Sequence, residues 1–121
     1  MIEKEIILNE FQKKIENCPV RHAMDKIGGK WKLIILHRIN VGLNRFGIMQ
    51  RAVPGISKQM LTAQLRELEL DGLITRQIYA EIPPRVEYFM TEKGKTLIPI
   101  LIQVEAWGRM EMQEKSPIPL K

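Results

Sequence analysis

The chain is 121 residues long, the length of one ordinary domain, and 45% of its residues are hydrophobic and 27% charged. This composition is typical of a folded globular protein and excludes an intrinsically disordered one. The longest unbroken apolar run, 97–102, is far short of the ~20 residues of a membrane span, and the charged N-terminus argues against a secretory signal. The single cysteine excludes an intramolecular disulfide and a cysteine-based metal cluster. We therefore expect a cytoplasmic protein that has no membrane partner.

The net charge of +5 is unevenly distributed along the chain. Residues 20–60 contain eight basic residues and one acidic residue, a net charge of +7, so the remainder carries −2. A basic segment inside a folded pattern indicates an anionic partner such as a nucleic acid. On charge alone, a solvated basic surface without any partner explains the segment equally well.

The first 40 residues contain three helical patterns. Apolar residues recur at helical spacing over 3–16, and Pro19 suits the first turn of a second helix that ends at Gly28–Gly29. Residues 31–40 are apolar on nearly every side, which predicts a central buried helix that Gly42 ends.

A turn signal then separates two further helices. An extended piece at Arg45–Phe46 precedes a short helix over 47–52, and Pro54–Gly55 is typical of a turn. Ser57 is a good N-cap for a helix that runs to Asp71 with a leucine stripe on one face. Gly72 fits the left-handed position that follows this helix.

The last third of the chain reads as a hairpin followed by a helix. Residues 73–78 and 86–90 are strand-like and flank a loop over 80–85. Thr91 then caps a last helix over about 92–111, which Pro99 is expected to bend.

Two helices joined by a tight turn and followed by a two-stranded hairpin are the layout of a winged helix-turn-helix. We therefore predict a mainly α (α+β) fold, with the helix after Ser57 as the recognition helix. Its face opposite the leucines carries side chains that reach base edges or phosphates, while its acidic residues lie in its C-terminal half. These candidate residues are Lys58, Gln59, Thr62, Ala63 and Arg66. A plain solvated helix face is the alternative.

The hairpin loop has the composition of a wing. Pro83 and Pro84 stiffen it, and Arg85 follows at once, which suits contact with a minor groove or its phosphates. The alternative is an edge hairpin with a solvated arginine.

Cys18 and the two histidines are the remaining candidates for chemistry. Cys18 precedes Pro19, so it is expected at a helix N-terminus, which favours the thiolate and suits a redox or electrophile sensor. A buried structural thiol is the alternative. His22 and His37 have no carboxylate cluster at ligand spacing, so we expect no metal site and no cofactor, and no orienting group accompanies Cys18 and His22 for catalysis.

Together these residues resemble the HxlR family of bacterial winged helix-turn-helix transcriptional regulators. The resemblance covers about 17–108. The matching stretches are Cys18-Pro19-Val20, Ile27-Gly28-Gly29-Lys30-Trp31, Arg45-Phe46, Pro54-Gly55-Ile56-Ser57-Lys58, Met60-Leu61-Thr62, Leu65-Arg66-Glu67-Leu68, Asp71-Gly72-Leu73-Ile74, Pro83-Pro84-Arg85-Val86-Glu87-Tyr88 and Thr91 to Gly94.

The resemblance implies a homodimer joined through terminal helices, binding to inverted-repeat operator DNA, and transcriptional control. In several relatives the cysteine at the position of Cys18 senses oxidants, quinones or aldehydes, which makes such an effector plausible here. The chain departs from the family pattern after Phe46, where Gly47, Ile48 and Met49 replace the usual Ser, Glu and Leu. We expect Gly47 to serve as an N-cap without a hydroxyl, and Ile48 to be exposed.

The sequence thus predicts one domain over 1–121, with a DNA-binding core at about 30–90 and dimerisation helices at about 3–16 and 92–112. It predicts a sequence-specific DNA-binding regulator, not an enzyme. Its expected DNA-binding residues are Arg45, Arg51, Ser57, Lys58, Gln59, Thr62, Arg66 and Arg85, and its expected sensing residue is Cys18. The alternative function is a winged-helix module that docks another protein without specific DNA binding.

Overall fold

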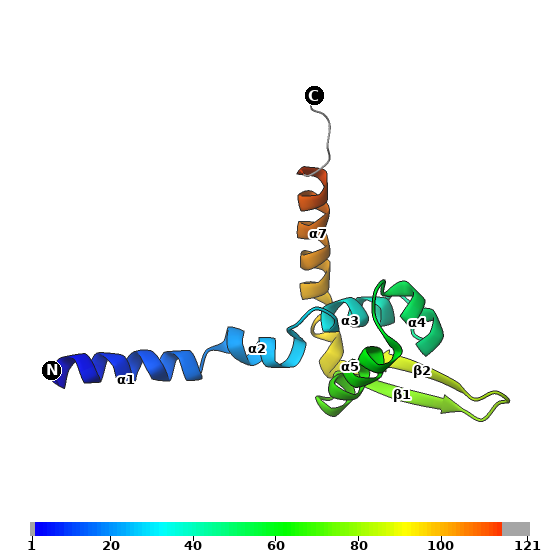
Figure 1. Ribbon diagram of the computed structural model, residues 1–121, viewed down its shortest axis with the longest axis horizontal. Coiled ribbons are helices and arrows are strands. Elements are labelled where there is room, and N and C mark those ends of the chain that lie inside the picture. Colours follow the sequence, from blue (N-terminus) through cyan, green and yellow to red (C-terminus); the bar gives the residue numbers. More distant parts are fainter. Residues whose placement is uncertain (1, 115–121) are drawn as a thin grey trace.

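The computed structural model describes residues 2–114, which fold into helices and one two-stranded antiparallel sheet. The elements are α1 (Ile2–Glu16), α2 (Pro19–Ile27), α3 (Lys32–Asn40), α4 (Phe46–Ala52), α5 (Lys58–Leu70), β1 (Ile74–Tyr79), β2 (Arg85–Met90), α6 (Glu92–Lys95) and α7 (Ile98–Glu114). Figure 1 shows α3, α4, α5 and the hairpin gathered into one body, from which α1 with α2 and α7 project as two arms. This is the predicted mainly helical, winged helix-turn-helix architecture.

The core lies where α3, α4 and α5 meet the base of the hairpin. Ile35 and Leu36 of α3 are fully buried, as is Met49 of α4. The leucine stripe of α5 completes the core with Leu61, Leu65 and Leu68. The predicted inward face of α5 is therefore confirmed, and the opposite face is left for solvent or a partner.

Two glycines determine the path of the backbone after α5, one by its conformation and one by a close approach. Gly72 follows the helix with φ +75°, the left-handed conformation that its place after the helix predicts. Gly94 of α6 lies so close to the Leu73 carbonyl that a Cβ would collide with it. The Thr91 backbone N–H donates to the same carbonyl at 3.1 Å, so the start of β1 and the end of β2 are joined at one point.

The hairpin is fastened to the helices by a short stretch of extra strand pairing. β1 and β2 pair in register from Ile74↔Met90 to Tyr79↔Arg85. The Tyr88 N–H donates to the Asn44 carbonyl at 2.9 Å, and Asn44 Nδ2 returns a 2.9 Å bond to the Tyr88 carbonyl. Arg45 is therefore extended, as predicted, whereas Phe46 already begins α4. Arg45, not Gly47, is the N-cap of α4, which corrects the expected capping residue.

The C-terminal helix predicted over 92–112 is two helices. α6 ends at Lys95, a turn follows at Thr96–Leu97, and α7 begins at Ile98. Pro99 has no N–H to donate to the Lys95 carbonyl four residues earlier, so one continuous helix would lose a hydrogen bond there. Pro99 instead lies in the first turn of α7, where its missing N–H costs nothing, and it bends no helix.

One buried charge ties α3 to α5. Lys32 is only 7% exposed, and its Nζ lies 2.8 Å from Glu67 Oε1. Removing the carboxylate would leave an ammonium group buried without its counter-charge, which costs more than the pair itself contributes.

We expect Glu67→Gln to lower the free energy of unfolding by about 1–3 kcal/mol, measured by urea denaturation. Lys32→Met keeps the buried stem without the charge and should cost less than about 1 kcal/mol. Glu69→Gln is the matched control, because Glu69 Oε2 lies 4.0 Å from Arg76 Nε in a more exposed pair. Equal stabilities of Glu67→Gln and Glu69→Gln would contradict this role of Lys32.

Candidate nucleic-acid interface

The helix-turn-helix is formed by α4, the turn at 53–57 and α5. Val53 and Ile56 are buried and anchor the turn, and Gly55 crosses it with φ +87°. Arg38 Nε donates to the Ala52 carbonyl at 2.7 Å, which caps the C-terminal end of α4 from α3. The angle between α4 and α5 is thus fixed by the burial of Val53 and Ile56 in the core and by the hydrogen bond from Arg38 to the end of α4.

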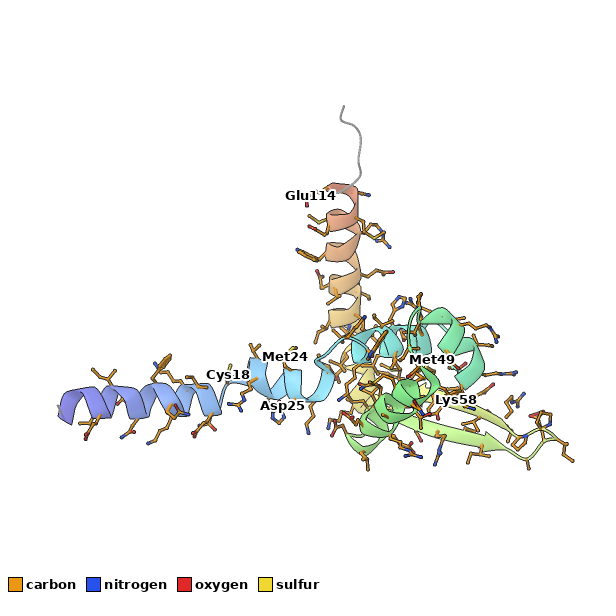
Figure 2. The ribbon with its side chains drawn as sticks, viewed as in Figure 1. Cys18, Met24, Asp25, Met49, Lys58 and Glu114 are labelled. Carbon is orange, nitrogen blue, oxygen red and sulfur yellow. The ribbon has the colours of Figure 1, made fainter. Side chains whose placement is uncertain are left out.

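The outward face of α5 presents side chains that the fold does not use. Lys58, Gln59 and Arg66 are exposed, and within residues 2–114 no hydrogen bond or ion pair engages their side chains. Figure 2 shows Lys58 at the surface of the body that carries the wing. The structure therefore places these three predicted residues on one free helix face, and a long polar side chain there can reach a base edge or a phosphate.

The two hydroxyls of this region are oriented by α5 itself. Ser57 Oγ accepts the Met60 N–H at 3.0 Å, which confirms the predicted N-cap and leaves the hydroxyl proton free to donate. Thr62 Oγ1 donates to the Lys58 carbonyl at 2.8 Å, so its lone pairs remain free to accept. Ser57 is thereby suited to a phosphate oxygen and Thr62 to a base amino group.

The two predicted arginines beside α5 differ in their surroundings. Arg51 is exposed in the last turn of α4, and no described residue forms an ion pair with it. Arg45 Nε instead donates to Glu87 Oε2 at 3.1 Å. Of the two, only Arg51 is available to an anion without breaking an existing contact.

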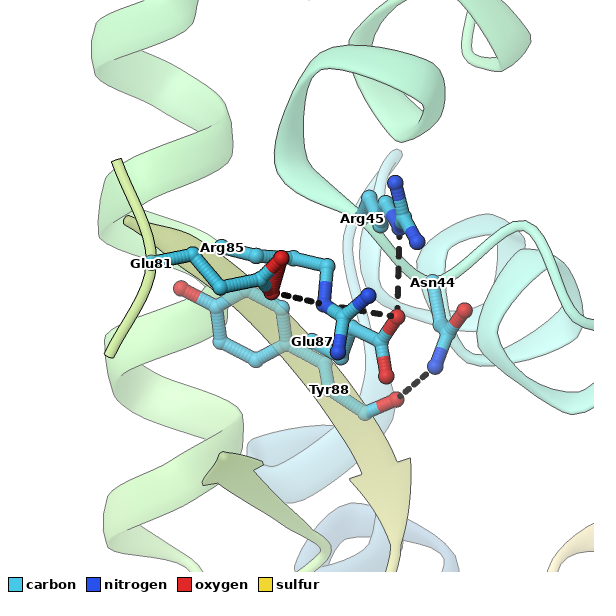
Figure 3. Close-up of polar contacts among 6 residues, drawn as sticks. All are labelled: Asn44, Arg45, Glu81, Arg85, Glu87 and Tyr88. Atoms are coloured by element: carbon cyan, nitrogen blue, oxygen red, sulfur yellow. Dashed lines mark hydrogen bonds and ion pairs between the residues drawn. The ribbon is translucent and has the colours of Figure 1, made fainter. Parts of the chain in front are cut away.

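Arg85 is held at the base of the wing loop, as Figure 3 shows. Its Nε lies 3.2 Å from Glu81 Oε2 and 3.7 Å from Glu87 Oε2, and its guanidinium stacks 4.0 Å from the Tyr79 ring centroid. The Nε is buried and aligned with neither carboxylate for a hydrogen bond, so the contact is electrostatic. The predicted contact between Arg85 and DNA stays a prediction, and the geometry gives this residue an intrachain role first.

The eight cations of the basic segment 20–60 differ in whether they have a partner within the chain. Four of its eight cations already have partners in the chain: Lys26 with Asp71 Oδ1 at 3.4 Å, Lys32 with Glu67, Arg38 with the Ala52 carbonyl, and Arg45 with Glu87. Lys30 lies over the Trp31 ring, 4.7 Å from its centroid. Net charge along the sequence therefore overstates the charge that is free to attract an anion.

Sequence reasoning missed the cluster that Glu69 of α5, Arg76 of β1 and Tyr88 of β2 form at the hairpin. Tyr88 is buried, and burial raises the pKa of its phenol above the usual 10, against the opposing effect of the Arg76 charge. Arg76 is exposed on β1, beside Glu69 of α5. The alternation of β1 and β2 was the available signal, since Arg76 and Tyr88 are partners in the sheet register.

Cys18 occupies the expected place, in extended backbone at the N-cap of α2, and its side chain is half-buried. Figure 2 shows it at the junction of α1 and α2, on the arm remote from Lys58. His37 lies at the margin of the core, with Nδ1 2.8 Å from Arg38 Nη1 and Nε2 3.7 Å from Glu105 Oε2. Among the described residues no cluster of three or more His, Cys, Asp or Glu could hold a metal, and none of the described helices is long and apolar enough to cross a membrane.

The sequence matches known regulators over most of its length. The model of the HxlR-like helix-turn-helix family matches residues 26–116. The HTH-type transcriptional regulator YybR of Bacillus subtilis is 50% identical over 93 residues, which span 77% of this chain and 74% of YybR. An HTH-type transcriptional regulator of Methanothermobacter thermautotrophicus is 52% identical over 93 residues, which span 77% of this chain and 71% of that protein.

Solved structures share the fold as well as the sequence. The redox regulator HypR in its oxidised form superposes with a TM-score of 0.74 at 48% identity, over 77% of this chain and 96% of HypR. The reduced form of the transcriptional regulator YodB from Bacillus subtilis gives a TM-score of 0.64 at 35% identity, over 74% of this chain and 89% of YodB. With the helix-turn-helix, the free face of α5 and the wing in place, these matches show that the chain belongs to the HxlR family of winged helix-turn-helix transcriptional regulators.

Proposed function

We propose that the protein is a dimeric, sequence-specific DNA-binding regulator that acts on inverted-repeat operators in the cytoplasm. The observation that carries the proposal is the free face of α5, where Lys58, Gln59 and Arg66 are exposed and unengaged among the described residues. Gln59 and Arg66 have the donor and acceptor geometry that reads adenine and guanine edges in a major groove. Ser57 caps the start of α5, Arg51 lies in the last turn of α4, and both suit the flanking phosphates.

The opposing charges on α5 favour DNA over a protein partner. Glu67 and Glu69 lie in the C-terminal half of α5, where Glu67 is already paired with Lys32. Because these carboxylates would repel phosphates, we expect the N-terminal half of the helix to lie closest to the DNA backbone. The centre of a protein-docking interface is apolar and poor in charge, whereas the start of α5 exposes Lys58 and Gln59 beside the apolar Met60. Salt dependence separates the two functions, because releasing counterions from phosphates is specific to nucleic acid.

Duplex DNA binding should weaken steeply with salt. The three cations of α4 and α5, Arg51, Lys58 and Arg66, give a dimer a log–log slope of about −5. Arg66→Ala and Gln59→Ala should lose about 1–3 kcal/mol of preference for the selected sequence. Arg51→Ala should weaken specific and random duplexes alike and make the slope shallower by about 2 in the dimer. Fluorescence anisotropy over a salt series measures all three, and a slope near −1, or equal losses on both duplexes for every variant, would contradict the assignment.

The arms supply the surface for a second protomer. On α1 the side chains of Ile7, Phe11 and Ile15 are between 41% and 64% exposed, and α7 likewise exposes Val104 and Trp107. Apolar stripes of this extent on projecting helices are typical of interfaces, and a two-fold axis would bring both stripes of each protomer into use. The two α5 helices would then lie about one DNA turn, ~34 Å, apart.

Phe11→Glu should raise the dissociation constant of the dimer by about 100-fold or more, since each two-fold interface contains the substitution twice. Sedimentation velocity across a micromolar concentration series measures the change. Leu70→Glu, at a still more exposed apolar residue of the body that carries the wing, is the control and should leave the dimer intact. A wild-type protein that remains monomeric at these concentrations would contradict the dimer.

We propose in addition that Cys18 senses oxidants or electrophiles. It lies where α1 joins α2, so an adduct there acts on the arm that is proposed to hold the second protomer. The names of the neighbours agree, because HypR is a redox regulator and YodB has been studied after diamide treatment. Since Cys18 is the only cysteine, a disulfide must join it to the partner protomer or to a small thiol.

Diamide together with a small thiol should lower the affinity of the wild-type protein for DNA by about 5–150-fold, the range of an ordinary coupling between sites. Cys18→Ser should bind DNA like the reduced wild type and should not respond to the oxidant. Titrating both proteins in the anisotropy assay, with mass spectrometry to identify the adduct, measures the response. Identical titrations of the two proteins would show that Cys18 is a structural thiol.

A further inference from the structure

The tip of the wing is apolar where a charged contact is expected. Ile82 is fully exposed at the tip, and Pro83 and Pro84 follow it. The charged residues on either side, Glu81 and Arg85, face one another at 3.2 Å. The part of the wing that extends furthest from the body in Figure 1 therefore carries an exposed branched aliphatic side chain and no free cation.

Arg85 is poorly placed to replace Ile82 as the contacting residue. Its guanidinium stacks on Tyr79 and lies beside the carboxylates of Glu81 and Glu87, while Glu87 also accepts from Arg45 (Figure 3). Moving the guanidinium onto a phosphate would break the stacking and leave two carboxylates facing the DNA backbone, which they would repel. In this arrangement Arg85 positions the wing.

We propose that the wing enters the minor groove with Ile82 as an apolar wedge. Proteins that bind this groove insert Ile, Leu, Phe, Met or Pro side chains between base steps, at a cost that is lowest at flexible pyrimidine–purine steps. Ile82 and the two prolines after it have this chemistry, and α5 defines the adjacent major groove. This inference rests on the proposed function and deepens it, because it assigns the second element of DNA recognition and its sequence preference.

An apolar wedge and a charged wing differ in two measurable properties. A wedge releases no counterions, so its loss leaves the salt dependence of binding unchanged, whereas the loss of a phosphate contact makes the slope shallower. A wedge also couples affinity to the deformability of a base step that no side chain reads by hydrogen bonds. Both properties are tested on the full-length protein and on short duplexes that the wild type selects from a random pool.

Ile82→Ala should weaken binding to the selected duplex by about tenfold, the amount expected from removing most of a buried aliphatic side chain. The log–log salt slope should stay that of the wild type. Leu70→Ala removes another highly exposed aliphatic side chain, at the C-terminal end of α5, and should change neither quantity. Circular dichroism of Ile82→Ala should match the wild type, because a fully exposed side chain contributes nothing to the core.

The base step under the wing is located with a fluorescent adenine analogue moved along each flank of the duplex. Wild-type protein should increase the fluorescence at one step per half-site by unstacking it, and Ile82→Ala should not. Replacing that step by a stiff A-tract should weaken the wild type but leave Ile82→Ala nearly unaffected.

An unchanged affinity for Ile82→Ala, or a shallower salt slope, would overturn the wedge while leaving the proposed function intact. An unchanged affinity would indicate that the tip contacts a protein instead of DNA. A shallower salt slope would indicate that the wing contacts DNA through charged groups. If the wild type selects no duplex at all, the proposed function fails and the wedge with it.

Discussion

The position of the wing depends on two reciprocal hydrogen bonds between Asn44 and Tyr88. The Tyr88 N–H and carbonyl both bond to Asn44, and the next residue, Arg45, forms a single β-bridge with Glu87, so the segment after α3 is fastened to β2. Because α4 begins immediately after this segment, the same two bonds fix the entry into the helix-turn-helix and the base of the hairpin. The distance between the α5 face and the wing tip is therefore set by the protein before any DNA arrives. Such preorganisation reduces the ordering cost that binding would otherwise incur.

The charged residues fall into those that stabilise the fold through ion pairs and those that are exposed without an ion-pair partner. Glu87 accepts Arg45 and lies beside Arg85, Glu67 neutralises the buried Lys32, and Asp71 lies beside Lys26. Except for the contact between Glu87 and Arg85 within β2, each of these pairs joins elements that are distant in sequence and so contributes to the arrangement of the fold. On α4 and α5 the cations Arg51, Lys58 and Arg66 form no ion pair with a described residue. The cations that hold the fold together are thus distinguished from these three by carboxylates or carbonyls close to them.

Local signals predicted most of the fold. The leucine spacing of α5, the Ser57 cap and the left-handed Gly72 each depend on a few neighbouring residues, and each was found where the sequence placed it. The break between α6 and α7 was not predicted, and one helix bent at Pro99 was expected instead, because a proline does not indicate whether it lies inside a helix or at the start of a new one. The partners of Arg38 and Arg45 lie 14 and 42 positions away in the chain, so no local pattern could distinguish these residues from a free arginine. Arg85 instead contacts Glu81 and Glu87, which are close to it in the sequence. The outward face of α5 was accessible to sequence reasoning because helical periodicity alone divides this helix into a buried and an exposed side.

If the proposed function holds, the partners that half of the cations in the basic segment find within the fold have a consequence for how the regulator would find its target. Non-specific affinity for duplex DNA grows with the number of phosphates that are neutralised, and it determines how long a protein remains on each stretch of chromosome that it samples. A chain with all eight cations of 20–60 exposed would bind every stretch tightly and leave it slowly. With four of them engaged within the fold, each encounter with unrelated sequence would be shorter, and a larger share of the binding free energy would come from contacts that discriminate between bases. Partners within the fold would therefore shorten the residence time on random DNA and speed the movement between candidate sites.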